Sequence, residues 1–121
     1  MAIRTVLVVD DIASHLSEIQ GIVSGVGYQV ITAQSGQEAV DKAKKQLPDL
    51  VFMDIVMPEM DGFAACRELK SDTTTKDIPV VFVSSKDQEA DKVWAQLQGV
   101  EDYVTKPYTP EQIIEKINKF A

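Results

Sequence analysis

The run Thr5-Val6-Leu7-Val8-Val9 is apolar along almost its whole length and does not alternate between polar and apolar side chains. A strand with one solvent-facing side alternates, whereas a strand covered on both faces is apolar throughout, as in parallel sheets. The runs Leu50–Met53 and Pro79–Val83 have the same character. These three runs therefore predict the central strands of a parallel sheet.

The run Gln29–Ala33 and a weaker one at Asp102–Thr105 bring the predicted strands to five. The segments between the runs carry apolar residues three or four positions apart, which is the spacing of one helix face, and such faces pack on the core. A further helix is expected near Gly62–Ser71. The four clearest faces are Leu16, Ile19, Val23 and Val26; Ala39, Val40, Ala43 and Leu47; Ala90, Val93, Trp94 and Leu97; and Ile113, Ile114, Ile117 and Phe120.

Two helix starts are marked by their side chains. Ser35 with Glu38, and Thr109 with Gln112, have the spacing of a capping box, in which each side chain bonds a backbone N–H near the other. Pro110 stands at the first helical position, where a helix tolerates proline. The pattern predicts helices that begin just after Ser35 and Thr109.

Five alternating strand–helix units predict an α/β fold, a (βα)5 chain with a doubly wound, parallel, five-stranded sheet of the flavodoxin-like type. Right-handed crossovers restrict the strand order, and 2-1-3-4-5 is a common arrangement. The sequence shows no linker and no internal repeat. We therefore expect residues 1–121 to form a single domain with no output domain attached.

The composition narrows the classes of function. The chain has 121 residues, 45% of them hydrophobic, a single cysteine and a formal net charge of −7. An acidic surface argues against binding nucleic acid or anionic lipid. No apolar run approaches the roughly 18 residues of a membrane span, and the start Met1-Ala2-Ile3-Arg4 does not resemble a signal peptide. We expect a cytoplasmic domain with no membrane insertion.

Charged and polar residues follow the predicted strands directly. Asp10 and Asp11 follow the first strand, Asp54 the third, Ser84 the fourth and Lys106 the fifth. Ligands of such sheets bind outside the carboxyl ends of the strands, where the winding direction switches. The three carboxylates and one ammonium sum to −3 + 1 = −2, so a divalent cation would neutralise the cluster. Oxygen ligands without His or Cys favour Mg²⁺.

A cation, an ammonium and a hydroxyl around one carboxylate also suit phosphoryl transfer, because its transition state spreads negative charge over oxygens. Asp54 is the candidate nucleophile and would form an aspartyl-phosphate. We expect the lone His15 to be a solvated surface residue and Cys66 to be a small core side chain.

The sequence resembles the receiver domain of two-component response regulators, the CheY-like family. The matching segments run in the family's order over the whole chain. They are Val8-Val9-Asp10-Asp11, the stretch Met53–Gly62 containing Asp54 and Met57-Pro58, the strand Pro79–Ser84, and Asp102-Tyr103-Val104-Thr105-Lys106-Pro107.

The resemblance implies a role for each matching residue. Asp54 would accept a phosphoryl group from a phosphohistidine of a sensor kinase. Asp11, Asp54 and the backbone carbonyl of Val56 would bind Mg²⁺ directly, with Asp10 acting through water. Lys106 would pair with the phosphoryl oxygens, Ser84 would hydrogen-bond them, and Tyr103 would turn inward once that hydroxyl moves. The Lys106–Pro107 peptide bond is expected to be cis. The chain would be a phosphoacceptor that catalyses only its own phosphorylation and dephosphorylation.

The family's switch would alter the surface of helix 4, strand 5 and helix 5. Val93, Trp94 and Leu97 lie on or beside that surface in the sequence, but we expect them to be core residues of an amphipathic helix. Downstream, a single-domain receiver would act on a motor or pilus-associated protein, or serve as a phosphate sink or relay. The stretch Ser85–Trp94 looks most like the PilH-type regulators of twitching motility and pilus-linked chemotaxis, which implies a CheA-like kinase. A general chemotaxis regulator is the competing pathway.

Three other classes of protein share part of this pattern. A haloacid-dehalogenase-like phosphatase also uses a nucleophilic Asp with Mg²⁺, but it needs a second acid two residues later, where this chain has Val56. A flavodoxin-like FMN protein would need a hydroxyl-rich phosphate loop in place of Asp10-Asp11. A pseudo-receiver that only binds would usually have lost Asp54 or the acidic pair.

Overall fold

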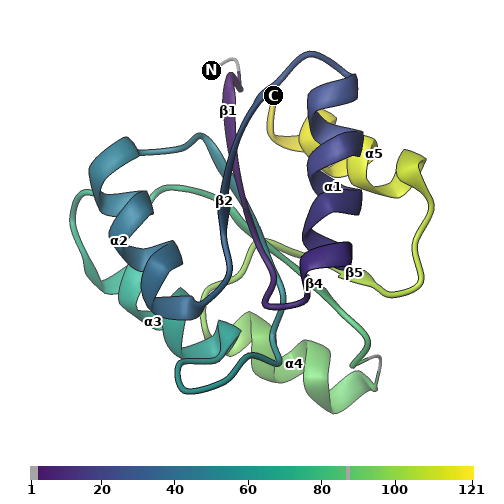
Figure 1. Cartoon of the computed structure of the whole chain (residues 1–121). Helices are drawn as coiled ribbons and strands as arrows, with labels where there is room; N and C mark the ends of the chain where they lie inside the picture. The colour runs from purple at the N-terminus through teal and green to yellow at the C-terminus, as the bar shows by residue number, and fades with distance from the viewer. Residues whose placement is uncertain (1–2, 87) are drawn as a thin grey trace.

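The computed structural model describes residues 3–86 and 88–121, so the predicted features that fall on Met1, Ala2 and Asp87 lie outside the described residues. Within that part of the chain, strands and helices alternate (Figure 1). The strands are β1 Thr5–Val9, β2 Gln29–Ala33, β3 Leu50–Met53, β4 Val80–Ser84 and β5 Asp102–Thr105. The helices are α1 Ala13–Gly25, α2 Gly36–Gln46, α3 Gly62–Ser71, α4 Glu89–Leu97 and α5 Pro110–Phe120.

The described strands form one sheet in the order β2-β1-β3-β4-β5, and every pair is parallel. The predicted fold class and strand order are therefore confirmed. In the register of the sheet, Val9 at the end of β1 lies opposite both Ala33 of β2 and Met53 of β3. The residues that follow β1 and β3 consequently leave the sheet at the same level.

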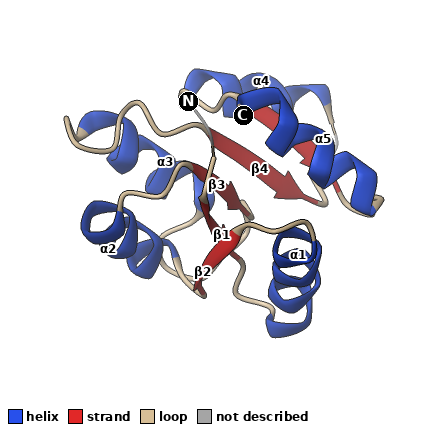
Figure 2. Ribbon diagram, turned by 90° about the horizontal axis from the view of Figure 1, so that it is seen from above, coloured by secondary structure: helices blue, strands red, loops and turns tan. Residues whose placement is uncertain are grey.

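The core has one layer on each face of the sheet. Residues of β1 alternate between the two layers, with Leu7 and Val9 in one and Val6 and Val8 in the other. Helices α1 and α5 cover one face, while α2 and α3 cover the other, as Figure 2 shows. This double covering is the reason that β1, β3 and β4 are apolar along almost their whole length.

Strand β4 begins and ends one residue later than we predicted. Pro79 has no N–H and cannot donate in a strand ladder, although its carbonyl accepts from the Val51 amide at 3.0 Å. At the other end, the Ser84 carbonyl accepts from the Lys106 amide at 2.8 Å, which extends the pairing with β5. The polar residue Ser84 thus belongs to the strand and is completely buried.

The predicted core face of α4 was wrong. Val93, Trp94 and Leu97 are 47%, 51% and 69% exposed, and the buried residue of this helix is Ala95. A helix can approach its neighbours closely through a small residue. Because α4 packs through Ala95, its larger apolar side chains lie on the sides of the helix that face solvent. Trp94 makes an edge-to-face contact with Phe63, which packs against the core, at 6.3 Å between ring centroids.

Two apolar residues at helix ends are also more exposed than their spacing suggested. Val26 and Leu47 are 44% and 52% exposed. Both stand just past the last helical residue, and Leu47 has left-handed backbone angles with φ 47°. The change of backbone direction at these positions takes their side chains off the helix face.

The predicted helix starts lie where expected. Thr109 and Gln112 form a reciprocal capping box, and Pro110 is the first residue of α5. Ser35 accepts from the Glu38 amide at 3.1 Å, but the Glu38 carboxylate accepts from the Gln34 amide instead of the Ser35 amide.

In the described part of the chain, no helix is both long enough and apolar enough to cross a membrane.

Candidate functional site

The carboxyl ends of the strands bring distant acidic residues together. Asp10 follows β1 and Asp54 follows β3, and the backbone holds both in line with the sheet. The Asp10 amide donates to the Ala33 carbonyl at 3.1 Å, and the Asp54 amide donates to the Val9 carbonyl at 3.0 Å. Each aspartate is thus positioned by its own strand and by the neighbouring one.

Asp10, Asp11 and Asp54 each offer a carboxylate oxygen within 4.8 Å of the other two. Asp10 and Asp54 are buried, and Asp11 is partly exposed. Backbone amides bind one oxygen of each buried aspartate: Ile12 donates to Asp10 Oδ1 at 2.9 Å, and Ile55 donates to Asp54 Oδ1 at 2.8 Å. These bonds aim the remaining oxygens toward one another.

Lys106 reaches this cluster from the end of β5. Its Nζ donates to Asp10 Oδ2 at 2.9 Å and to Asp54 Oδ2 at 3.4 Å. The Lys106–Pro107 peptide bond is cis, as the resemblance implied. The structure therefore brings four of the predicted site residues, Asp10, Asp11, Asp54 and Lys106, into direct or near contact.

The electrostatics of Asp54 reflect this crowding. Burial raises the pKa of the Asp54 carboxyl above its ordinary value, Lys106 lowers it, and the neighbouring Asp10 raises it further, so that the net shift is upward. One ammonium does not balance three carboxylates. A second cation beside Asp54 would favour its ionised form.

The donor set fits a hard divalent cation. Asp11 Oδ1 is buried, and within the described residues no hydrogen-bond donor reaches it. A buried oxygen without a donor is costly unless something else satisfies it. All three candidate ligands are carboxylate oxygens, with no Cys sulfur or His nitrogen among them. Such a ligand set suits Mg²⁺ better than a softer metal.

Ser84 and Tyr103 are not part of the acidic cluster and do not line the pocket beside Asp54. Ser84 is completely buried, and its Oγ accepts from the Lys86 amide at 3.3 Å. The half-buried Tyr103 packs edge-to-face on Phe82 at 6.3 Å between centroids, and its hydroxyl donates to the Lys86 carbonyl. Both side chains thus bind the backbone of one residue in the loop that follows β4.

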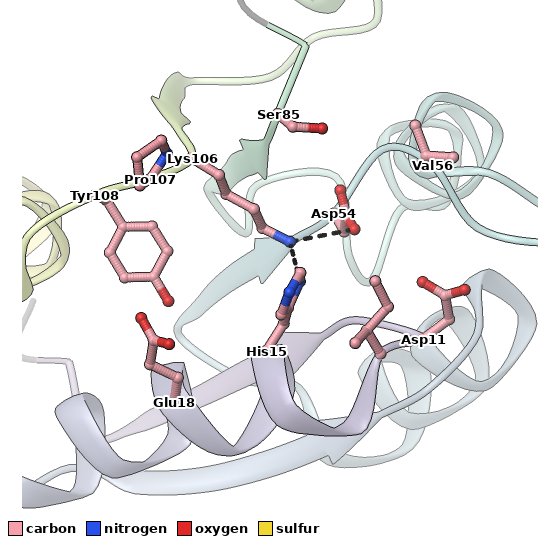
Figure 3. A pocket seen from close by; sticks show the side chains of 10 residues that line it. Asp11, His15, Glu18, Asp54, Val56, Ser85, Lys106, Pro107 and Tyr108 are labelled. Carbon is pink, nitrogen blue, oxygen red and sulfur yellow. Dashed lines mark hydrogen bonds and ion pairs between the residues drawn. The ribbon is translucent and has the colours of Figure 1, made fainter.

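A pocket of about 570 Å³ opens beside Asp54 (Figure 3). Its lining includes the predicted residues Asp11, Asp54, Val56 and Lys106, while Ser85 replaces the buried Ser84 at its wall. Val56 is 57% exposed and presents an apolar surface two residues after Asp54.

The pocket lining also includes His15, Glu18 and Tyr108, which were not among the predicted site residues. The His15 side chain is 42% exposed, as expected of a surface residue, but its Nδ1 also lies 2.9 Å from Lys106 Nζ, a contact that the prediction did not include. The Tyr108 hydroxyl points to the Glu18 carboxylate (Figure 3); burial, together with this acidic neighbour, raises the pKa of Tyr108. A signal was present in the sequence, since His15 stands four residues after Asp11 and Glu18 three residues after His15, which is the spacing of one helix face.

The loop between Asp54 and α3 is tightly closed. The Gly62 amide donates to the Ile55 carbonyl at 2.7 Å, and the Asp61 side chain caps α3 by accepting from the Ala64 amide at 2.9 Å. Glu59 has a left-handed backbone with φ 65°. Cys66, on the buried side of α3, is a core residue as predicted.

Comparisons with known proteins agree with this geometry. Residues 6–118 match the family model of the response regulator receiver domain. Protein PilH of Pseudomonas aeruginosa is 43% identical over 113 residues, covering 93% of each chain. Response regulator PleD of Caulobacter vibrioides is 37% identical over 96% of this chain, which corresponds to 26% of PleD.

Solved structures show the same fold. The chemotaxis protein CheY4 of Vibrio cholerae superposes with a TM-score of 0.93 at 28% identity, over 99% of this chain and 100% of CheY4. The receiver domain of the sensor histidine kinase PA1611 of Pseudomonas aeruginosa superposes with a TM-score of 0.91 at 24% identity, over 98% of each chain. That structure holds a magnesium ion in its active site cleft.

Proposed function

Because the chain belongs to the response regulator receiver domain family, we propose that Asp54 accepts a phosphoryl group from a phosphohistidine of a sensor histidine kinase. The observation that carries the proposal is the convergence of Asp10, Asp11, Asp54 and Lys106 at the ends of three strands. One oxygen of Asp54 would bond to phosphorus as the bond from phosphorus to the imidazole nitrogen breaks. That nitrogen keeps the electron pair, and the donor is left as a neutral histidine with one proton on its ring, either the one it already carried or one taken up from water.

Each residue of the cluster would have a separate role in phosphoryl transfer. Asp11, Asp54 and the Val56 carbonyl would hold Mg²⁺, and Asp10, whose two oxygens already accept from Ile12 and Lys106, would act through water. A bound Mg²⁺ neutralises charge on the phosphoryl oxygens and orients them for in-line transfer. Lys106, whose Nζ lies between Asp10 and Asp54, would pair with a phosphoryl oxygen in place of an aspartate.

We propose that Ser84 and Tyr103 couple phosphorylation of Asp54 to the surface formed by α4, β5 and α5. A phosphoryl group on Asp54 offers strong acceptors that would draw the Ser84 hydroxyl toward it. Both side chains bind the backbone of Lys86, so a movement of Ser84 would loosen the loop that Tyr103 also holds. The exposed apolar residues of α4, together with β5 and α5, would then form the surface that binds a downstream protein.

The similarity to PilH supports a role in pilus-linked twitching motility or taxis, with a CheA-like kinase as the donor. The match spans 93% of PilH as well as 93% of this chain. The downstream partner would be a motor or pilus-associated protein in the cytoplasm. A phosphate sink or relay in another two-component system is the alternative, and the absence of a phosphorylation-dependent partner would favour it.

Phosphorylation by a small donor tests the acceptor chemistry directly. We expect acetyl phosphate with Mg²⁺ to add a single phosphoryl mass to the intact protein, and EDTA to prevent the addition. Treatment with hydroxylamine, which attacks acyl phosphates, is expected to mark Asp54 in the peptide map. A folded protein that takes up no phosphoryl group in the presence of Mg²⁺ would instead indicate a pseudo-receiver that acts by binding alone.

Val56 is expected to set the lifetime of the phosphorylated form. Its exposed isopropyl group lines the pocket beside Asp54 and offers no hydrogen bond to a water molecule that attacks the phosphoryl group. The Val56→Asn variant supplies such a partner and should lose its phosphoryl group about fivefold faster. The decay of the adduct after removal of acetyl phosphate measures this rate, with Val56→Leu as a control that changes the side chain without adding a hydrogen-bonding group. An unchanged rate in Val56→Asn would contradict the expectation.

A further inference from the structure

We propose that His15 is a positioning residue for Lys106, which it holds beside Asp54 by accepting a hydrogen bond at Nδ1. The His15 Nδ1 atom lies 2.9 Å from Lys106 Nζ, as close as the Asp10 oxygen and closer than the Asp54 oxygen at 3.4 Å. Figure 3 shows the imidazole rising from α1 toward the ammonium group, on the side of the pocket that faces Asp54.

The direction of this hydrogen bond follows from the chemistry of the two groups. A lysine ammonium has three protons and no lone pair, so it can only donate. The His15 Nδ1 atom must then accept, which places the imidazole proton on Nε2. Asp10 Oδ2 lies 3.8 Å from the same Nδ1, and both atoms accept from the ammonium between them.

Three acceptors therefore meet the three protons of Lys106. A lysine side chain is long and flexible, and ordering it costs conformational entropy. Asp10 and Asp54 hold the ammonium from the ends of β1 and β3, and His15 holds it from the first turn of α1. Contacts from three separate elements leave the ammonium little freedom, and its side chain is only 14% exposed.

A neutral acceptor has an advantage in this position. The cluster already contains three carboxylates, and a fourth negative charge would increase their repulsion. The imidazole supplies a lone pair without that charge. His15 is held by its own helix position, since it lies in the first turn of α1, whose N-cap residue is Ile12. Preorganising Lys106 lowers the entropy lost when it meets the phosphoryl group.

Two substitutions separate the hydrogen bond from the shape of the side chain. Asn carries its Oδ1 one bond from Cγ, as His carries Nδ1, so His15→Asn keeps an acceptor at the same distance from the backbone. His15→Leu fills a similar volume at that distance and removes the acceptor. The side chain of His15 is 42% exposed, so both variants are expected to fold like the wild type.

The kinetic part of the test rests on the proposed function. Phosphorylation by acetyl phosphate in excess Mg²⁺, followed by intact mass, is expected to slow about tenfold in His15→Leu and to stay within about twofold of wild type in His15→Asn. Equal slowing in both variants would show that the shape of the ring matters rather than its acceptor, and would overturn the proposal. A wild-type rate in His15→Leu would overturn it as well.

A second readout is independent of phosphorylation. In nitrogen-15 NMR spectra, an ammonium that is hydrogen-bonded and shielded from water exchanges its protons slowly enough to be seen. We expect a Lys106 ammonium signal in the wild type and in His15→Asn, assigned by its absence in Lys106→Arg, and its loss by exchange in His15→Leu. An unchanged signal in His15→Leu would overturn the proposal. If the wild type takes up no phosphoryl group, the proposed function fails while this spectrum still decides the role of His15.

Discussion

An Asp54→Asn variant is expected to lose the phosphoryl adduct completely while it remains folded. Asn has the shape of Asp but a poorly nucleophilic amide oxygen, so the rate of adduct formation should fall by more than about a thousandfold. The amide can still accept from the Ile55 backbone N–H, which lies 2.8 Å from the Asp54 carboxylate. Intact mass after incubation with acetyl phosphate and Mg²⁺ measures the loss.

Asp61→Asn is the matched control, because it makes the same chemical change in the same loop. Asp61 caps α3 through its Oδ1, and Asn caps a helix as well as Asp does. We therefore expect Asp61→Asn to take up the phosphoryl group at nearly the wild-type rate. A normal adduct in Asp54→Asn would place the acceptor at another residue.

The stability of Asp54→Asn should also depend on pH in a defined direction. Burial and the neighbouring Asp10 outweigh Lys106 and raise the pKa of Asp54 in the folded state above its ordinary value. Ionisation of Asp54 therefore destabilises the fold, and the penalty is absent below the ordinary pKa and complete above the raised one. In EDTA, Asp54→Asn should gain stability relative to wild type at neutral pH and not at strongly acidic pH. Thermal melts at both pH values measure the difference.

The second large effect concerns stability: Gly62→Ala is expected to destabilise the fold by about 3 kcal/mol. A Cβ atom on Gly62 would lie 2.3 Å from the backbone oxygen of Asp54 and 2.8 Å from the Cα of Ile55. Both are backbone atoms, so no side-chain rotation relieves the clash. The loop must move instead, and with it the Gly62–Ile55 hydrogen bond of 2.7 Å. Chemical denaturation measures the loss, and the same movement should slow phosphorylation of Asp54.

Gly21→Ala makes the same substitution in a helix without the clash. A Cβ on Gly21, within α1, would meet no described atom within 4 Å apart from the neighbouring backbone of its own helix. Since Ala favours a helix over Gly, this control should stabilise the protein by about 0.5–1 kcal/mol. If Gly62→Ala proves as stable as wild type, the close approach of α3 to the acceptor loop is looser than the structure shows.

Local patterns were sufficient for most of the architecture. Apolar runs such as Leu50–Met53 predicted the buried strands, because a strand covered on both faces needs no polar side. The capping residues Ser35 and Thr109 predicted two helix starts, because they satisfy backbone amides within a few residues. The strand order came from general rules for crossovers combined with a family resemblance, and the sheet confirms it.

Local sequence patterns did not predict which face of α4 is buried, because that depends on tertiary packing. The helical spacing of Val93, Trp94 and Leu97 is correct, yet the side that faces the sheet carries Ala95. The spacing of apolar residues shows that a helix has an apolar face. Whether that face packs on the sheet depends on the space between the helix and the sheet, which the spacing does not show. In α4 the small Ala95 packs against the core, and the larger Val93, Trp94 and Leu97 stay exposed.

The sequence by itself determined which residues stand at the ends of the strands, because a parallel sheet collects those ends at one edge whatever its details. That rule was enough to bring Asp10, Asp11, Asp54 and Lys106 together. The partners of each residue depended on the tertiary structure. His15 belongs to a helix and meets Lys106 across 91 positions of sequence, because the first turn of α1 lies at the same edge of the sheet as the residue that follows β5. Such a contact depends on the path of two loops and the tilt of a helix, which only the packed chain decides.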